Sequence, residues 1–330
     1  MDQRADTIAG APAVLTLEEV ADQTGISQDE VLALWRCLGL PAPEEGAPAF
    51  NAADVEAITA AHEVVLYEVL GRDTETSLLR AVSHTTERLA WWQFETLVDD
   101  AAARYDLDVQ SARLVVLDQV ADLADILEDQ MMYAWRKHLA GIIRSIGARI
   151  ATAGSWPEEM RENFPLVRAV GFADMVGFTA ASAGLGAAEL DALVQRFTEQ
   201  SRDIVAQGGG RIVKEMGDGI MFLTDEPVRG ALIALAFAEE LGANDDLPPV
   251  RVGLSWGQVL GRFGDVFGPT VNLASRLTDL AGRSQVWVDS RTAEVLEAEA
   301  PLRLVRLEQV AVEGVGLVRP YRLERRLGPD

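Results

Sequence analysis

Residues 166–175 read LVRAVGFADM, and residues 211–224 read RIVKEMGDGIMFLT. The first run is apolar and carries the β-branched residues that favour a strand. The second has Gly-Asp-Gly at 217–219 between two apolar runs, which is typical of a hairpin. AAELDALVQRFTEQSRDIVAQ at 187–207, between the two, is predicted to be a helix, and QVAVEGVGLVRPYRLE at 309–324 is predicted to be a closing hairpin. The C-terminal half is therefore predicted to pack helices on a sheet, as an α+β or α/β arrangement.

The sequence before this half predicts helices. Thr16 is followed by Glu19, and Ser27 by Glu30, which is the capping-box spacing that begins a helix, here repeated around a Gly turn. Further along, apolar residues recur three and four positions apart, and few residues demand a strand. This half is therefore predicted to be an all-α bundle.

Length and charge limit the classes of function. The chain has 330 residues, which suggests about two domains at roughly 150 residues each. We predict a helical domain at 1–150, a connector at 151–165 and a domain with helices packed on a sheet at 166–330. Lys and Arg total 29 against 52 Asp and Glu, so the formal net charge is −23. Such a chain is a poor partner for nucleic-acid phosphates or anionic lipid.

The same sequence predicts a cytoplasmic protein. No stretch approaches the roughly 18 uninterrupted apolar residues that would indicate a transmembrane helix. The first ten residues lack a basic start followed by an apolar run, so they do not resemble a secretory signal. Cys37 is the single cysteine, which fits a reducing compartment.

Two aspartates are the first candidates for chemistry. Asp174 ends an apolar strand, where a carboxylate is costly to bury unless it is paired or bound to a metal. Asp218 lies at the hairpin tip, where Asp often serves turn geometry alone. If adjacent strands bring the two together, their oxygens suit Mg²⁺ or Mn²⁺. A pair of such ions supports in-line phosphoryl chemistry.

Three segments, taken in order, carry a family resemblance. GFADMVGFT at 171–179, GGRIVKEMGDGIMF at 209–222 and GDVFGPTVNLASRL at 264–277 resemble the catalytic domain of class III nucleotidyl cyclases. The resemblance runs from about Leu166 to about Arg322. It implies a ferredoxin-like core that works as a head-to-tail homodimer, so the fold class is α+β with an all-α domain ahead of it.

The resemblance assigns the metal site. Asp174 and Asp218 would hold two ions, Mg²⁺ or Mn²⁺, with help from the backbone carbonyl of Met175. These groups would come from one protomer of the dimer.

The resemblance also assigns the base-reading pair to Lys214 and Asp265. A lysine donates to a ring nitrogen, and a carboxylate accepts from an exocyclic amine. Adenine offers that amine, whereas guanine places a carbonyl there and would face Asp265 with a second acceptor. We therefore expect ATP rather than GTP as the substrate.

Asn272 and Arg276 match the pair that acts in the transition state. They are four residues apart, so one helix face carries both. Taken alone, they would be read as a helix cap and a solvated arginine. The resemblance implies that Asn272 orients the ribose and Arg276 holds the phosphoryl charge. Both, together with the base-reading pair, would come from the partner protomer, which gives two equivalent sites per homodimer.

One position departs from the family pattern. VAVEGVG at 310–316 places Glu313 where many members have a lysine that contacts the nucleotide phosphates. Either another cation, for instance Arg262 or Arg283, replaces that contact, or substrate binding is weaker.

The expected activity is that of an adenylate cyclase, which converts ATP to 3′,5′-cyclic AMP and pyrophosphate. The alternative is a catalytically weak, cyclase-like module that binds nucleotide for signalling. A diguanylate cyclase is disfavoured, because MGDGI at 216–220 does not resemble a GGDEF turn.

The helical half is expected to regulate the catalytic half. DNA binding is disfavoured, since the helix that follows Ser27 carries Asp29 and Glu30 rather than a basic surface. The arrangement resembles soluble actinobacterial cyclases with an autoinhibitory, pH-responsive N-terminal domain. The three histidines, His62, His84 and His138, all lie in this half, so a pH response would begin here. A lipid-like ligand held by its apolar face is a further hypothesis.

Overall fold

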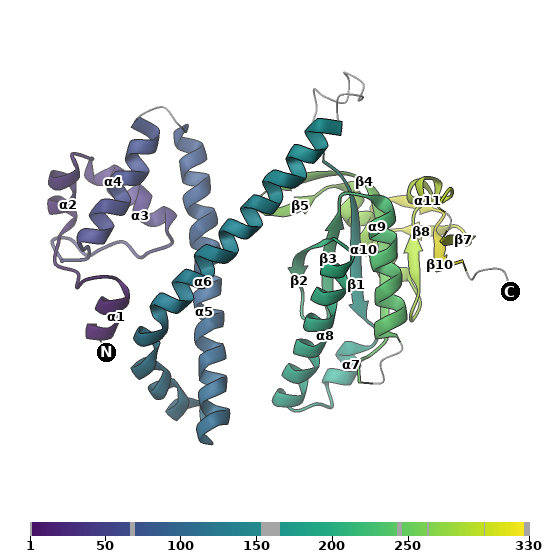
Figure 1. Cartoon of the computed structure of the whole chain (residues 1–330), viewed down its shortest axis with the longest axis horizontal. Helices are drawn as coiled ribbons and strands as arrows, with labels where there is room; N and C mark the ends of the chain where they lie inside the picture. The colour runs from purple at the N-terminus through teal and green to yellow at the C-terminus, as the bar shows by residue number, and fades with distance from the viewer. Residues whose placement is uncertain are drawn as a thin grey trace. The chain divides into compact units, whose positions relative to one another are not determined.

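The structure is a computed structural model that describes residues 2–66, 70–152, 166–242, 246–262, 264–299 and 301–326. The chain divides into two compact units, Met1–Ser155 and Trp156–Asp330 (Figure 1). The connector predicted at 151–165 lies almost wholly outside the described residues, so the domain bounds stay predictions.

The N-terminal unit is helical, as predicted. Its helices are α1 (Asp2–Ile8), α2 (Leu17–Thr24), α3 (Gln28–Cys37), α4 (Ala52–Leu66), α5 (Arg72–Tyr105) and α6 (Val109–Thr152). Thr16 caps α2 by accepting from the Glu19 amide, and the Glu19 carboxylate accepts from the Thr16 amide at 2.8 Å. Ser27 caps α3 by accepting from the Glu30 amide, and its hydroxyl donates to the Glu30 carboxylate at 2.9 Å. The predicted helix starts are therefore confirmed, although α1 had not been predicted.

The apolar face proposed as the frame of a ligand pocket is largely open. On α5, the side chains of Trp91 and Trp92 are 62% and 56% exposed. Helices α5 and α6 pack through a small cluster of Val98, Ala101, Ala112 and Val116. In the described residues, no helix is both long enough and apolar enough to cross a membrane.

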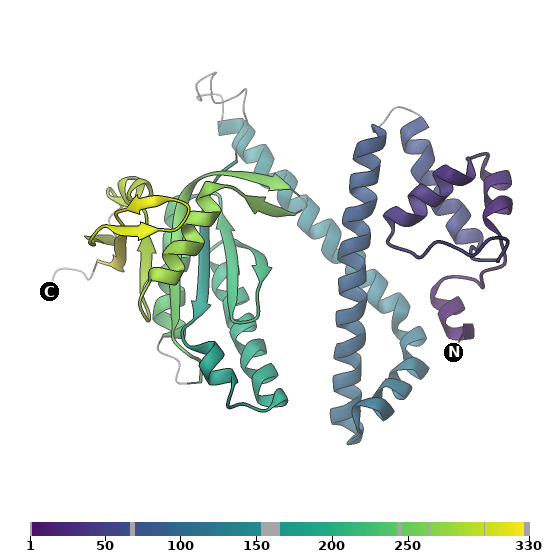
Figure 2. The same ribbon diagram turned by 180° about the vertical axis from the view of Figure 1, so that it is seen from behind.

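The C-terminal unit is built on one mixed sheet with strand order β2-β3-β1-β4-β6-β10-β7 (Figure 2). The strands are β1 (Leu166–Met175), β2 (Arg211–Glu215), β3 (Gly219–Thr224), β4 (Val250–Arg262), β5 (Asp265–Phe267), β6 (Val286–Val288), β7 (Leu302–Arg306), β8 (Val310–Val312), β9 (Gly316–Val318) and β10 (Tyr321–Arg325). The helices are α7 (Phe178–Ser182), α8 (Ala187–Gln207), α9 (Pro227–Ala236), which continues as a π-helical turn (Phe237–Leu241), α10 (Pro269–Leu280) and α11 (Ser290–Leu296). The α+β class with a ferredoxin-like core is confirmed.

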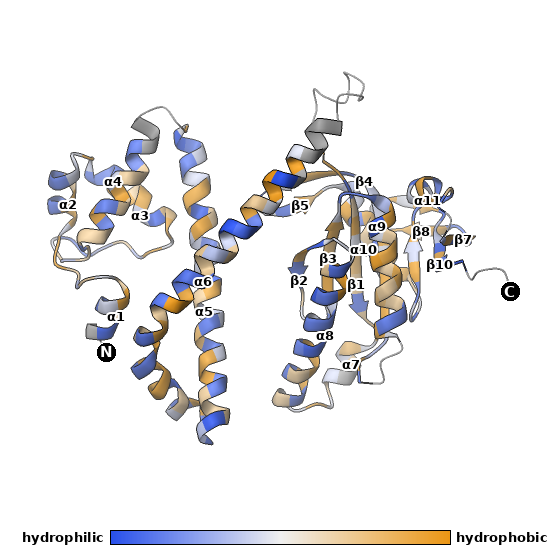
Figure 3. Ribbon diagram, viewed as in Figure 1, coloured by the Kyte–Doolittle hydropathy of each residue, from blue (hydrophilic) through white to orange (hydrophobic). Residues whose placement is uncertain are grey.

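Helices cover both faces of this sheet, which explains why β1 and β3 are apolar almost throughout. Helices α8, α9 and α11 pack on one face with Ala169, Ala173 and Met175 of β1. Helix α10 packs on the other face, where Ala274 meets Val170. Figure 3 shows the hydrophobic colouring of α9, which lies against the core.

The last segment differs from its prediction. Residues 309–324 were expected to form one closing hairpin. In the structure β8 and β9 form a small hairpin of their own, while β10 joins the main sheet between β6 and β7. Strand β7 had not been predicted. Its partner β10 is distant in sequence, and a five-residue strand has little periodicity of its own.

Candidate active site

Strand pairing brings the two candidate metal ligands side by side. Asp174, the penultimate residue of β1, pairs with Gly219, the first residue of β3. The amide of Met175 donates to the Asp218 carbonyl at 2.8 Å, which holds the hairpin tip against the end of β1. A Cβ on Gly219 would lie 3.3 Å from Asp174 Oδ1, so glycine leaves room beside the carboxylate. Both aspartates are half-buried.

Arg251 completes this end of the sheet and was missed by sequence reasoning. It lies directly opposite Asp174 in the β1–β4 register. Its Nη2 and Nε donate to Asp174 Oδ2 at 2.6 and 2.9 Å. The sequence does predict some cation here, because a carboxylate at the end of a buried strand requires one nearby, but it does not say which residue supplies it.

Burial is the main influence on the pKa of the Asp174 carboxyl group. Desolvation raises the pKa of its carboxyl above the ordinary value, and Arg251 opposes that shift by hydrogen bonding and by charge. The neighbouring charges of Asp218 and Asp279 add to the rise. A second cation at this position would therefore relieve a carboxylate that one guanidinium does not fully compensate.

The donor set at this end fits a hard cation. It consists of two carboxylates and a backbone carbonyl, which are oxygen ligands of the kind that Mg²⁺ and Mn²⁺ prefer. The described residues contain no cluster of three or more His, Cys, Asp or Glu side chains that could hold a metal. An ion here would thus need water or substrate phosphates to complete its shell.

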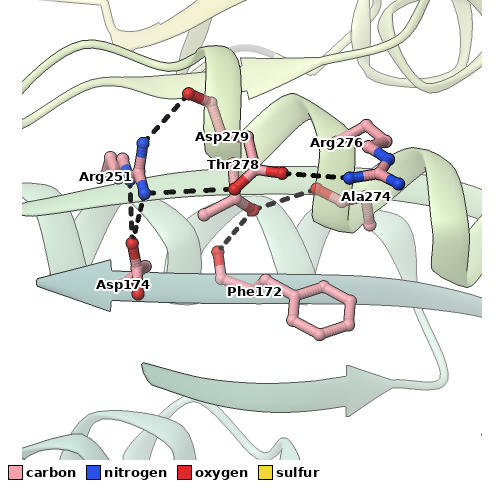
Figure 4. A network of polar contacts seen from close by, with 7 residues as sticks. All are labelled: Phe172, Asp174, Arg251, Ala274, Arg276, Thr278 and Asp279. Carbon is pink, nitrogen blue, oxygen red and sulfur yellow. Dashed lines mark hydrogen bonds and ion pairs between the residues drawn. The ribbon is translucent and has the colours of Figure 1, made fainter. Parts of the chain in front are cut away.

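A chain of charged contacts runs from the metal end to α10 (Figure 4). Arg251 Nη1 donates to the Asp279 carbonyl at 2.9 Å, and the Asp279 carboxylate lies 3.6 Å from Arg276 Nη1. Thr278 Oγ1 donates within α10 to Ala274 and lies 3.3 Å from the Phe172 carbonyl of β1. These contacts fix the position of α10, and hence of Arg276, relative to Asp174.

Asn272 and Arg276 open onto one cavity of about 830 Å³. They lie on the same face of α10, as predicted. The cavity is lined by Ser255, Trp256, Pro269, Thr270, Asn272, Leu273, Ser275, Arg276, Asp289, Arg291, Glu313, Gly314 and Val315. Its lining includes neither the metal aspartates nor the base-reading pair.

Lys214 and Asp265, the two residues expected to read the base, also lie together. Lys214 Nζ lies 2.5 Å from Asp265 Oδ2, and it lies 5.8 Å from the centre of the Phe267 ring. Strand β2 carries the lysine, and the β4–β5 arm brings the aspartate to it. The Lys214 ammonium and the Asp265 carboxylate thus form an ion pair beside the Phe267 ring.

Glu313 lies on the β8–β9 hairpin beside Arg276, with 4.0 Å between Oε2 and Nη2. Its side chain is 90% exposed. The two cations suggested as replacements for the missing lysine, Arg262 and Arg283, do not line this cavity.

Comparison with known proteins agrees with this geometry. Residues 165–325 match the adenylate and guanylate cyclase catalytic domain. An adenylate cyclase of Glutamicibacter nicotianae is 36% identical over 92% of this chain and 77% of its own length. One of Streptomyces coelicolor is 33% identical over 97% of this chain and 88% of its own length. A pH-sensitive adenylate cyclase of Mycobacterium tuberculosis is 26% identical over 87% and 71% of the two chains.

By its catalytic-domain match and its relatives, the protein is thus a nucleotidyl cyclase. More narrowly, the chain belongs to the class III family, whose members depend on metal ions.

Proposed function

We propose that this protein is an adenylate cyclase that converts ATP to 3′,5′-cyclic AMP and pyrophosphate. The observation that carries the proposal is the side-by-side placement of Asp174 and Asp218, with Asn272 and Arg276 sharing a cavity on α10. Relatives that match most of the chain bear the same activity in their names, which supports it.

Asp174, Asp218 and the Met175 carbonyl would hold two ions, Mg²⁺ or Mn²⁺. When bound, the ions would lower the pKa of the ribose hydroxyl and neutralise the negative charge of the phosphate tail. Arg251 holds Asp174 Oδ2, so Oδ1 is the oxygen of this carboxylate that would face an ion.

Arg276 would stabilise the charge that develops when the 3′ oxygen attacks the α-phosphorus. Its only ion-pair partners in the described residues are Asp279 at 3.6 Å and Glu313 at 4.0 Å. These are loose contacts, and they leave the guanidinium donors available for phosphoryl oxygens. Asn272, one turn earlier on α10, would orient the ribose.

A homodimer is the proposed working unit. The cavity around Asn272 and Arg276 has no metal aspartate in its lining, which supports a site whose two halves come from different protomers. Two-fold symmetry then gives two identical sites.

Base selection provides a direct test. Purified protein with Mn²⁺ should form cyclic AMP from ATP and much less cyclic GMP from GTP. Asp265→Asn should reduce the ATP-to-GTP ratio of kcat/KM by about tenfold, because the amide can donate to the guanine carbonyl that the carboxylate repels. Both products are measured by chromatography. If Asp265→Asn leaves the ATP-to-GTP ratio of kcat/KM unchanged, Asp265 does not read the base. Nucleotide bound without product would favour the weak, cyclase-like module instead.

The helical unit is proposed to regulate turnover in response to pH. A relative named as pH-sensitive supports this role. His62 lines a small cavity with Cys37, Glu30, Arg72 and Glu75. Glu75 is only 7% exposed, and its Oε1 has no hydrogen-bond partner among the described residues. Histidine is the side chain whose charge ordinarily changes near neutral pH, and His62 shares this cavity with the Glu75 carboxyl group and the Arg72–Glu30 ion pair.

Replacing His62 with Asn in the whole chain should therefore flatten the change of activity between about pH 5 and pH 8. His84→Asn is the matched control, because that side chain is exposed on α5. Activity is measured across this pH range at saturating ATP. If both variants keep the original profile, His62 is not the titrating group.

A further inference from the structure

The cavity beside α10 contains an arginine that the family pattern does not assign. Four charged side chains line it, namely Arg276, Arg291, Asp289 and Glu313. Arg276 faces Asp279 and Glu313. Arg291 is exposed and makes no hydrogen bond or ion pair with any described residue.

The backbone that presents Arg291 is firmly held. Asp289 caps α11, accepting from the Thr292 amide at 3.1 Å and from its hydroxyl at 2.6 Å. The Trp256 amide donates in turn to Thr292 Oγ1 at 2.7 Å. Asp289 and Thr292 are 6% and 0% exposed, so this cap is buried. The Asp289 carboxylate is thus held by Thr292 and forms no ion pair with Arg291.

We propose that Arg291 binds the β- and γ-phosphates of the nucleotide, replacing the cation that Glu313 fails to supply. This inference rests on the proposed cyclase function and names a further substrate-binding residue. A guanidinium that pairs with no described residue, on the wall of a cavity that also holds Arg276, is suited to bidentate contact with a phosphate.

Arg276 and Arg291 line the same cavity, in which the phosphate tail would lie. Asn272 and Arg276 are one turn apart, about 6 Å along the axis of α10, so ribose and α-phosphorus would lie over this helix. The tail would then lie between α10 and the β8–β9 hairpin, where Glu313 is 4.0 Å from Arg276 and would repel it. Arg291 is the remaining cation of the lining.

Arg291→Ala should raise KM for ATP about tenfold or more and leave kcat within about twofold, since the contact is the same in the bound and transition states. Arg291→Lys should lie between the two, because it keeps the charge and loses the bidentate geometry. Arg303→Ala is the matched control, because that arginine is exposed on β7 and pairs only with Glu324 among the described residues.

Charge exchange makes the test specific. Glu313→Lys should lower KM in the whole protein, and it should restore most of the affinity lost in the Arg291→Ala chain. If the role of Arg291 were purely structural, a lysine at position 313 on the β8–β9 hairpin would not restore the affinity for ATP.

A pyrophosphate-binding experiment tests this proposal independently of the proposed cyclase activity. Its binding to the whole protein in Mn²⁺ buffer, measured by calorimetry, requires no turnover. Arg291→Ala should weaken pyrophosphate binding about tenfold, and Arg303→Ala should not. If wild type binds pyrophosphate through Arg291 but makes no cyclic nucleotide, the cyclase function fails and this inference stands. If Arg291→Ala and Arg303→Ala have equal KM and equal pyrophosphate affinity, the inference is overturned.

Discussion

Asp174→Asn is expected to lower turnover by about a thousandfold or more, which corresponds to about 4 kcal/mol of lost transition-state stabilisation. The amide keeps one oxygen acceptor for Arg251 but removes the negative charge that would hold the ions. Without that charge, the ribose hydroxyl is no longer acidified and the phosphate tail is no longer neutralised. The measurement is the rate of cyclic AMP formation at saturating Mn²⁺ and ATP.

The same variant should remain folded. The folded-state pKa of Asp174 is raised, so any stability its carboxyl contributes is present below its unfolded pKa and is lost as pH rises through the folded pKa. At neutral pH in metal-free buffer, Asp174→Asn should therefore melt no lower than wild type. Asp100→Asn removes a charge from an exposed ion pair with Arg104 and should keep full activity. A large drop in the melting temperature of Asp174→Asn would attribute its inactivity to unfolding instead.

Local sequence was sufficient for the elements that carry the motifs. The strand at Leu166–Met175 and the helix at Ala187–Gln207 have the predicted bounds, because each has a long apolar pattern and a clear turn at its end. The helix with Asn272 and Arg276 was also predicted, since Pro269 sits in its first turn after Gly268.

The two additional arginines could not be predicted in the same way. Arg251 becomes notable only when the β1–β4 register sets it opposite Asp174. Arg291 becomes notable only when α11 and the β8–β9 hairpin close one cavity with α10. In sequence, each resembles a solvated surface charge, and the information that distinguishes it is long-range pairing.

Mixing two inactive chains should restore activity. Arg276→Ala removes the stabilising cation from one half of each site, and Asp174→Asn removes the metal ligand from the other half. In a random mixture half of the dimers contain both variants, and each such dimer has one intact site of two. Recovery should therefore approach about a quarter of wild-type activity at equal concentrations.

The control mixture combines Asp174→Asn with Asp218→Asn. Both defects lie on the same side of a shared site, at adjoining ends of β1 and β3, so every dimer keeps two damaged sites. This mixture should stay inactive. Subunit exchange is verified by labelling the two chains and following energy transfer between them. If exchange is complete and the Asp174→Asn with Arg276→Ala mixture remains as inactive as the control, each chain carries a whole site and the shared-site dimer is wrong.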